Sequence, residues 1–347
     1  MKKIASIVAA AAAAALMFSG CASEQPAEPT ESPTAPETTA AEEPTAEAQT
    51  FKIAITKFLA HPSLDLIADG FKDALTDAGV TAEYVEDDAQ AEVANTTTIA
   101  GKYAADPSIN LILGIATPSA QALVTSIKDR PILYAGVTDP VTAGIVPSWD
   151  ASGTNVSGTS DLNPEGKPLG LILEAMGAEN VKKVGFPYTL AEKNSEVQLE
   201  QLQAEAEGTG VEIVPAGVSN ASELTQGLES LKSKGVDAIH VGTDNTIVGA
   251  ISQVVSFGQQ NKIPIFSLDA NSVSEGTVAA RGIDYYKLGV RTGEMAVQIL
   301  VQGVDVGTIP QLQVTDTQVV ANPTAADSMG LTLPEAFTAN AEIVGGE

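Results

Sequence analysis

Three predicted strands in the first half of the chain end beside a proline, in segments that begin helices and carry polar side chains. The segments are Ala60-His61-Pro62, Ala116-Thr117-Pro118-Ser119 and Val137-Thr138-Asp139-Pro140. Proline favours the first helical position, and Thr or Asp just before it is a good helix cap. Free backbone N–H groups and positive helix ends therefore point to one edge, where hydroxyl donors join them. The pattern suits a small carboxylate. A phosphate loop is excluded because its glycines and lysine are missing. Simple capping is the alternative reading of any single segment.

Acidic, amide and aromatic side chains follow the predicted strands of the second half. The candidates there are Tyr188, Asn194, Thr243, Asp244, Asn245 and Asp269. Carboxylates can receive an ammonium group, and Tyr188 offers an aromatic wall. One side suited to a carboxylate and one suited to an ammonium together describe an amino-acid site. For Asp244, capping of the next helix is an equally good interpretation.

The elements that position these residues are predicted to be alternating strands and helices. Short apolar runs indicate strands, and stretches at helical spacing, such as Leu64, Ile67 and Phe71, lie between them. Near-continuous apolar strands that alternate with helices favour parallel sheets covered on both faces. The series restarts near residue 181, after a linking segment around residues 158–168. We therefore predict two similar α/β lobes, with the ligand at the carboxyl ends of the strands.

The amino terminus predicts export and a lipid anchor. Met1-Lys2-Lys3 is followed by a small and apolar run, which ends at Cys21, the only cysteine of the chain. The run is shorter than the roughly 20 residues of a comfortable membrane-spanning helix. It resembles a lipoprotein signal with Cys21 as the modified residue, although Phe18 departs from that pattern. An ordinary cleaved leader or a buried free thiol is the alternative. Residues 22–50 contain no Lys, Arg or aromatic residue, as in an unstructured tether.

Composition and motif content exclude several classes of function. The formal net charge of the 347 residues is −26, and no basic patch is visible, so nucleic acid is a poor partner. The two histidines, His61 and His240, lie far apart, and no cluster has metal-ligand spacing or the elbow of a serine hydrolase. We expect no catalytic residues, no metal and no cofactor.

An ordered set of motifs resembles the extracytoplasmic solute-binding lipoproteins of ABC importers, of the tryptophan- and tyrosine-binding type. The resemblance covers roughly Phe51 to Pro334. Its motifs are His61-Pro62-Ser63-Leu64-Asp65, Ala116-Thr117-Pro118-Ser119-Ala120-Gln121, Val137-Thr138-Asp139-Pro140-Val141, Gly158-Thr159-Ser160-Asp161-Leu162, Thr243-Asp244-Asn245-Thr246, Gly282-Ile283-Asp284-Tyr285-Tyr286-Lys287-Leu288-Gly289 and Thr292-Gly293-Glu294-Met295-Ala296.

This resemblance implies a type I periplasmic-binding-protein fold in which the chain crosses between the lobes about three times. The implied divisions are a signal peptide at 1–20, a tether at 21–50, lobe 1 at 51–158 and 280–310, and lobe 2 at 159–279 and 311–347. A helix from Tyr285 to Gln302 then returns to lobe 1, and Gln313–Asn322 rejoins lobe 2.

The resemblance also implies site residues and partners. Matching positions suggest Thr117, Ser119 and Thr138 for the carboxylate, Asp244 or Asp269 for the ammonium, and Asp161 as a further polar candidate. The partners would be a small ligand, with an aromatic amino acid favoured, and an ABC permease. We expect a monomer tied to the outer face of the cytoplasmic membrane through its lipid alone.

Two departures from the family pattern leave the ligand's side chain open. Lys57 and Arg281 stand where neutral residues are usual, and a cationic wall would favour a more polar ligand. Aromatic residues for a stacking pocket are few, with Phe58, Tyr134, Tyr188 and Phe266 the plausible ones. A nucleoside or sugar ligand, and a sensor that presents its ligand to a receptor, remain alternative interpretations.

Overall fold

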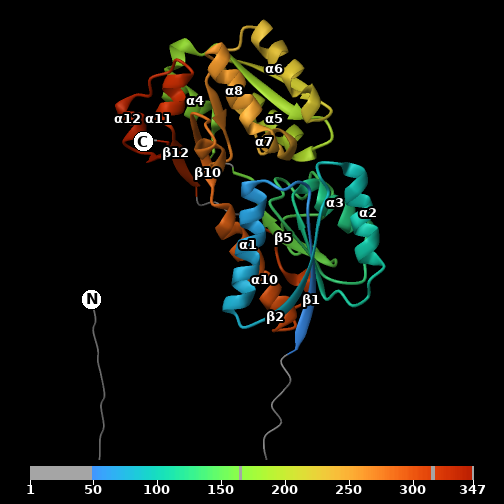
Figure 1. Ribbon diagram of the computed structural model, residues 1–347. Coiled ribbons are helices and arrows are strands. Elements are labelled where there is room, and N and C mark those ends of the chain that lie inside the picture. The colour runs from blue at the N-terminus through green and yellow to red at the C-terminus, as the bar shows by residue number, and fades with distance from the viewer. Residues whose placement is uncertain (1–48, 164–165, 314–316, 346–347) are drawn as a thin grey trace, which may run out of the picture. The chain divides into compact units, whose positions relative to one another are not determined.

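A computed structural model describes residues 49–163, 166–313 and 317–345. The leader, Cys21 and the predicted tether up to residue 48 lie outside the described residues. Within the described part the strands form two separate sheets, and we call each sheet with its helices a lobe (Figure 1).

Lobe 1 is built on a six-stranded sheet in which every described pairing is parallel. Its strands, in spatial order, are β11 (Leu312–Gln313), β5 (Val156–Ser160), β4 (Ile132–Ala135), β3 (Leu111–Ile115), β1 (Thr50–Lys57) and β2 (Thr81–Asp88). Its helices are α1 (Pro62–Asp77), α2 (Val93–Ala104), α3 (Thr117–Ser126) and α10 (Tyr285–Leu300), with a short 3-10 turn, η3 (Val306–Thr308).

The helices of lobe 1 cover its sheet in two pairs, α1 with α10 and α2 with α3 (Figure 1). Glycines bring the backbones of α1 and α10 together. A Cβ atom on Gly70 would lie 2.2 Å from the carbonyl oxygen of Tyr286, and one on Gly289 would lie 2.2 Å from that of Ile67. No side chain fits at such an approach. The return of α10 to lobe 1 therefore depends on these two glycines.

Lobe 2 is built on a seven-stranded sheet in which the β10–β12 pair is antiparallel and the other described pairs are parallel. Its strands, in spatial order, are β13 (Glu342–Ile343), β12 (Thr317–Ala321), β10 (Ala279–Ile283), β9 (Ile265–Ser267), β8 (Ala238–Val241), β6 (Lys183–Thr189) and β7 (Glu212–Val218). The fold is the predicted pair of α/β lobes with mostly parallel sheets.

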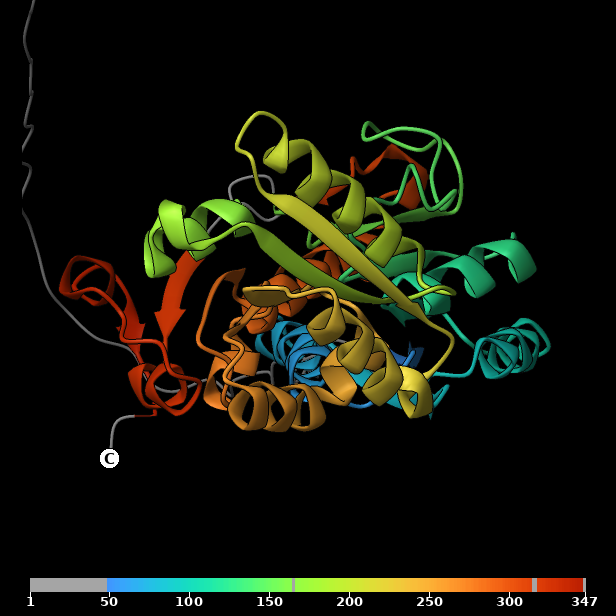
Figure 2. The ribbon, with the colours of Figure 1, turned by 90° about the horizontal axis from the view of Figure 1, so that it is seen from above.

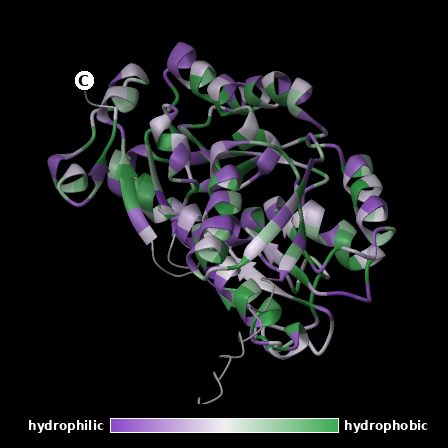
Figure 3. Ribbon diagram, turned by 60° about the horizontal axis from the view of Figure 1, so that its bottom comes forward, coloured by the Kyte–Doolittle hydropathy of each residue, from purple (hydrophilic) through white to green (hydrophobic). Residues whose placement is uncertain are grey.

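The helices of lobe 2 also lie on both faces of its sheet. They are α4 (Pro168–Met176), α5 (Lys193–Ala206), α6 (Leu224–Ser233), α7 (Asn245–Gly249), α8 (Ile251–Asn261), α9 (Asn271–Ser274), α11 (Pro323–Ser328) and α12 (Glu335–Thr338), with 3-10 turns η1 (Ala178–Asn180) and η2 (Ala221–Glu223). Figure 2 shows β6 and β7 running between α5 on one side and α6 and α8 on the other. Along the helices, hydrophobic and hydrophilic residues alternate (Figure 3), as expected of amphipathic helices on a sheet.

The lobe divisions differ by a few residues from those that the sequence implied. Thr159 and Ser160 stay in lobe 1, because β5 continues to pair with β4 and β11. Residues 280–283 belong to lobe 2 as part of β10, and Leu312 and Gln313 form β11 of lobe 1. Strand pairing, which joins residues far apart in the sequence, sets these limits.

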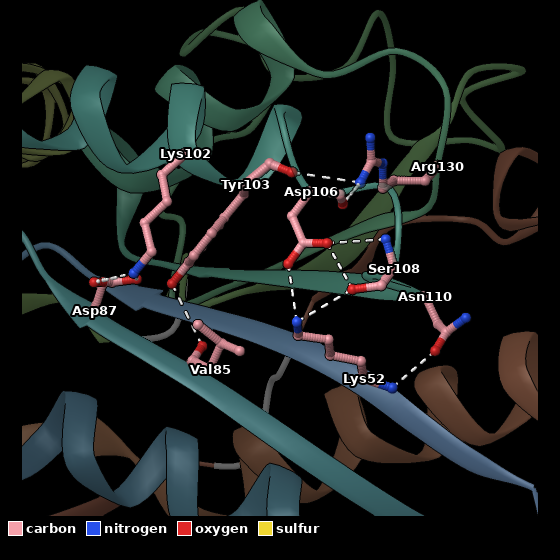
Figure 4. Close-up of polar contacts among 9 residues, drawn as sticks. All are labelled: Lys52, Val85, Asp87, Lys102, Tyr103, Asp106, Ser108, Asn110 and Arg130. Carbon is pink, nitrogen blue, oxygen red and sulfur yellow. Dashed lines mark hydrogen bonds and ion pairs between the residues drawn. The ribbon is translucent and has the colours of Figure 1, made fainter.

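A polar network fastens the start of β1 to neighbouring loops (Figure 4). The Lys52 ammonium donates to Asp106 at 2.9 Å and to the Ser108 hydroxyl at 3.1 Å, while the Arg130 guanidinium donates to the carbonyl of Asp106. The Lys52 and Asp106 side chains are partly solvent-exposed, so their ion pair contributes little to stability. This network lies at the edge of the sheet where the parallel strands begin. The opposite edge, at the carboxyl ends of the strands, remains available for a ligand.

Candidate ligand-binding site

A small cavity lies where carboxyl ends of strands from both lobes meet. Lobe 1 and the segment that follows β5 contribute His61, Ser63, Leu64, Gly136, Asp161 and Tyr285, and lobe 2 contributes Thr243, Asn245, Val248 and Asp269. The cavity volume is about 10 Å³, which is about the room that one water molecule needs. An amino acid does not fit in this arrangement, so a ligand of that size requires the lobes to move apart.

Asp161 is the carboxylate with unused hydrogen-bonding capacity in this cavity. It follows β5 at the first crossing between the lobes, and only 4% of it is exposed. The Tyr285 hydroxyl donates to its Oδ2 at 3.3 Å, whereas Oδ1 has no partner among the described residues. Burial raises the pKa of Asp161 to about 6, and the hydrogen bond from Tyr285 opposes this shift. A cationic group placed here would stabilise its charged form.

Asp269 lines the same cavity from lobe 2 and links the two lobes directly. Its Oδ2 accepts from the Ser63 hydroxyl of lobe 1 at 2.7 Å and from Ser272 at 3.1 Å, and its Oδ1 accepts from the Asn271 N–H at 3.0 Å. The Ser63 hydroxyl in turn accepts from the Asn271 side-chain amide at 3.0 Å. Separation of the lobes would break the bonds to Ser63 and leave Ser272 as the remaining donor to Oδ2 of Asp269 among the described residues.

The first turn of α3 carries two hydroxyls without hydrogen-bond partners in the described chain. Thr117 and Ser119 are 2% and 1% exposed, and their hydroxyl oxygens are fully buried. Ala116, between β3 and α3, has a φ of 75°, an uncommon conformation for a residue with a Cβ atom. Such strain often marks functional positions. The Ala116 N–H donates to the carbonyl of Ala135 at the end of β4. Ala135 directly precedes Gly136, which lines the cavity, so the start of α3 lies beside the cavity.

Other predicted residues reach the cavity or its margin. Thr243 and Asn245 line it, and the hydroxyls of Thr138 and Thr243 lie 3.5 Å apart across the two lobes. Asn194 is buried beside it, and its side-chain amide donates to the Thr243 carbonyl at 3.0 Å. The structure therefore brings Asp161, Thr243, Asn245 and Asp269 together, with Thr138 and Asn194 next to them.

Asp244 does not line this cavity, and its carboxylate is fully engaged within lobe 2. It accepts from the backbone and hydroxyl of Thr189, at 2.5 and 2.9 Å, from the Ser195 hydroxyl at 2.7 Å, and from the Ile247 N–H at 2.9 Å. Of its two interpretations, capping of α7 is the one that the geometry favours. Asp269 and Asp161 are therefore the better candidates for an ammonium.

Glu192 is a buried carboxylate that the sequence analysis missed. It accepts from the backbone and side chain of both Asn245 and Thr246, and so fixes the start of α7, which presents Asn245 to the cavity. Burial and the nearby Asp244 charge raise the pKa of Glu192 to about 7, while the hydrogen bonds from Asn245 and Thr246 oppose the shift. Its sequence signal is slight, since Glu192 sits in a polar stretch between β6 and α5.

Three expected features lie away from the cavity. Asp139 caps the turn after β4 by accepting from the backbone N–H groups of Val141 and Thr142. Tyr188 packs beside Phe186, with ring centroids 6.3 Å apart, against the core of lobe 2. Phe58, Tyr134 and Phe266 are buried in the two cores. No predicted aromatic residue lines the described cavity, whereas Tyr285 does.

The two unusual cations are both held in ion pairs. The Lys57 ammonium contacts Asp65 in α1, and the Arg281 guanidinium lies 3.2 Å from Glu174 in α4. Neither residue lines the cavity. The expectation of a cationic wall that selects a more polar ligand therefore has no support in this geometry.

His61 and Ser63 are further cavity residues that sequence reasoning left out. Neither ring nitrogen of His61 has a hydrogen-bond partner within the described residues, although both are buried. Burial lowers the pKa of His61, while the carboxylate of Asp269 opposes that shift. The signal was present in the His61-Pro62-Ser63 motif, but a histidine before a proline is usually a turn residue.

The described residues contain neither a membrane-spanning helix nor a metal-binding cluster. None of their helices is long and apolar enough to cross a membrane. None of their groups of His, Cys, Asp or Glu has the arrangement that would hold a metal ion.

The chain was then compared with known proteins. The sequence model of the family described as ABC transporter substrate binding protein matches residues 52–344. The chain belongs to this family. Its members bind solutes for ABC transporters outside the cytoplasm and are not enzymes. A curated relative, the tyrosine-binding protein of Clostridioides difficile, is 40% identical over 274 residues, which are 78% of either chain.

Two solved structures of the family add information on the lobes. The ABC domain from Streptococcus pneumonia in complex with L-Trp has 34% identity and a TM-score of 0.80, over 85% of this chain and all of the other. The ligand-free, open structure of a substrate-binding protein with adhesive properties from Clostridium difficile has 37% identity but a TM-score of 0.63, over 86% and 100%. More distant solute-binding proteins share the type I periplasmic-binding-protein fold alone. The structure of the present chain is therefore more similar to the relative that holds L-Trp than to the ligand-free, open relative.

Proposed function

We propose that this protein captures an aromatic amino acid between its lobes and delivers it to an ABC import permease. The similarity to a tyrosine-binding protein and to a structure that holds L-Trp supports this ligand class. The observation that carries the proposal is the placement of complementary groups at one cleft. Asp161 and Asp269 supply negative charge, and the start of α3 supplies N–H and hydroxyl donors.

Both charges of a zwitterion need such partners. Leaving one partner of a buried ion pair alone costs about 3–5 kcal/mol, because the remaining charge is desolvated without compensation. In the proposed complex the ammonium lies at Asp161 and Asp269, and the carboxylate lies at the positive end of α3 with Thr117 and Ser119. Closure of the lobes then removes both charges from water.

The direct test is calorimetry on the purified protein with amino acids and matched analogues. L-Tyr, L-Trp and L-Phe are compared with tyramine, which lacks the carboxylate, and with 3-(4-hydroxyphenyl)propionate, which lacks the ammonium. Each analogue should bind more than a hundredfold more weakly than L-Tyr, as the loss of about 3 kcal/mol or more implies. If a nucleoside or a sugar binds tightly and no amino acid does, the proposed ligand class is wrong.

Variants at the start of α3 test the carboxylate end. Thr117→Val and Ser119→Ala each remove one hydroxyl donor to a charged group, so each should weaken L-Tyr binding by about 1.5–3 kcal/mol. Thr125→Val is the matched control, since the Thr125 hydroxyl, on the same helix, donates to the carbonyl of Gln121 on the exposed side. Equal losses in all three variants would point to damage of the helix instead of loss of a ligand contact.

We also propose that the protein is a monomer held at the outer face of the cytoplasmic membrane by a lipid on Cys21. The small-residue signal before Cys21 and the polar composition of residues 22–50 support an anchor followed by a tether. A flexible chain of about 30 residues has a root-mean-square reach of about 30 Å, enough to hold a binding lobe clear of the surface. Neighbouring genes for a permease and an ATPase would separate an importer from a ligand sensor.

A further inference from the structure

A second and larger cavity lies inside lobe 2, between α4, α5 and the ends of β8 and β9. Its volume is about 360 Å³, within the usual range of small-molecule sites. The lining residues are Asn163, Lys167, Pro168, Gln198, Gln201, Ala204, Glu205, His240 and Leu268. None of them lines the cleft between the lobes. The two cavities are separated by Gln198, whose side chain bonds to the backbone and hydroxyl of Thr243 at 2.8 and 2.5 Å.

Two polar groups in the wall of this cavity have no hydrogen-bond partner within the described part of the chain. His240 is only 2% exposed, and its buried Nδ1 has no hydrogen-bond partner among the described residues. The buried side-chain oxygen of Asn163 has no partner among the residues that the structure describes, while its nitrogen donates to the Arg281 carbonyl at 2.9 Å. Buried polar atoms in native proteins nearly always have partners. Two that lack them at one cavity indicate that an outside molecule supplies the bonds.

The chemistry of the wall narrows the kind of molecule. Most of the wall surface is apolar, which favours a hydrophobic body. Burial lowers the pKa of His240 to about 3, so its imidazole is neutral at pH 7. The Glu205 carboxylate already accepts from the N–H groups of Leu169 and Gly170 at the start of α4, at 3.1 and 2.8 Å. The Asn163 oxygen can only accept, and a neutral imidazole always offers one accepting nitrogen.

We propose that this cavity is a second ligand site, which binds a small, neutral, aromatic molecule that carries an N–H donor. The ring lies against the apolar wall formed by Pro168, Ala204 and Leu268. The N–H group donates to the Asn163 oxygen or to the imidazole of His240. The site is independent of the amino-acid cleft and does not rest on the ligand proposed there.

Histidine NMR offers a sharp test, because the chain has two histidines and each lines a different cavity. Indole is the probe, and benzofuran, which has the same shape without the N–H group, is its matched control. In protein labelled with ¹⁵N-histidine, indole should shift the ring signals of His240 with a Kd below about 1 mM. Benzofuran should bind at least tenfold more weakly, and L-Tyr should move the signals of His61. A His61→Gln variant assigns the two sets.

A pair of leucine substitutions on α5 controls for indirect effects. Ala204→Leu fills the cavity from an exposed position, so the fold should tolerate it and the indole-dependent shift of His240 should be lost. Gln203→Leu adds a leucine at the neighbouring exposed position, which does not line the cavity, and should leave indole binding unchanged. Indole that shifts His61 alone, equal binding of benzofuran, or unchanged binding in Ala204→Leu would each overturn the proposal.

Discussion

Replacing Asp161 with asparagine should stabilise the free protein and, in the same step, weaken its ligand binding. Asp161 is buried, and its Oδ1 has no hydrogen-bond partner among the described residues. The negative charge of Asp161 at neutral pH therefore lowers the free energy of unfolding. Asparagine keeps the shape and removes the charge. A residue retained at the expense of stability is expected where function requires it.

The size of the effect follows from the pKa of Asp161. A rise from 3.8 to about 6 corresponds to about 3 kcal/mol, at about 1.4 kcal/mol per pH unit. Because the folded pKa is raised, the stabilising contribution is complete below about pH 4 and is lost as the pH rises through 6. At pH 7 the full penalty applies. Since the Asn amide must also be buried, we expect the free energy of unfolding to rise by about 1–3 kcal/mol.

The assay is thermal and urea unfolding of wild type and Asp161→Asn between pH 4 and 8, without ligand. The variant should gain about 2–5 °C in Tm at pH 7 and little at pH 4, so that the two stability curves diverge between these values. Calorimetry with L-Tyr should show weaker binding by the variant. A variant that is less stable than wild type at pH 7, with a parallel pH profile, would refute the reasoning.

Asp269→Asn is the matched control, because that carboxylate has protein donors on both oxygens. Its replacement turns an acceptor into a donor that faces the Asn271 N–H or the hydroxyls of Ser63 and Ser272. We therefore expect it to lower the free energy of unfolding by about 1–3 kcal/mol while it also weakens ligand binding. Opposite stability effects with the same loss of affinity would indicate that both carboxylates bind the ligand and that only Asp269 also stabilises the fold.

Three further predictions concern the cleft and the anchor. A ligand ammonium beside Asp161 should lower the pKa of that carboxyl from about 6, so ligand binding below pH 6 should release protons and become weaker. Calorimetry in two buffers of different ionisation enthalpy measures the proton release, and equal binding heats in the two buffers would contradict it. Small-angle scattering should show a smaller radius of gyration with saturating L-Tyr than without it, and identical curves would argue against the hinge. Without ligand, the Ser63→Ala variant, which lacks the bond to Asp269, should be more open than wild type. Wild-type protein should fractionate with membranes and Cys21→Ala should not, so equal fractionation would remove the anchor.

The fold could be predicted from sequence because its signals are local. Apolar strands alternate with amphipathic helices over the whole body, and prolines mark the starts of α1 and α3. The lobe boundaries were less accurate, since they depend on pairing between distant strands. The short β11 pairs with Thr159 and Ser160, far away in the chain, and its two residues carry too little pattern to reveal that.

The role of each aspartate could not be predicted, because it depends on partners brought in by tertiary structure. Asp161, Asp244 and Asp269 all follow a strand and look alike in sequence. Asp244 receives hydrogen bonds from Thr189 at the end of β6 and from Ser195 in α5, about 50 residues earlier in the chain. No local rule indicates that these donors will surround Asp244 and leave Asp161 with an unpartnered oxygen.

Unused hydrogen-bonding capacity therefore separates the site from the scaffold better than residue type does. Glu192 and Asp244 are as buried as Asp161, yet their oxygens accept hydrogen bonds from several protein donors. These bonds hold the start of α7 in place. Asp161, Thr117 and Ser119 keep buried oxygens that the described protein does not satisfy. Each such atom costs stability, since a desolvated polar group without a partner is unfavourable. In the proposed complex, a ligand that supplies an ammonium and a carboxylate at these positions would remove that cost on binding. The free energy that these unsatisfied atoms cost the ligand-free protein would thus contribute to the free energy of ligand binding.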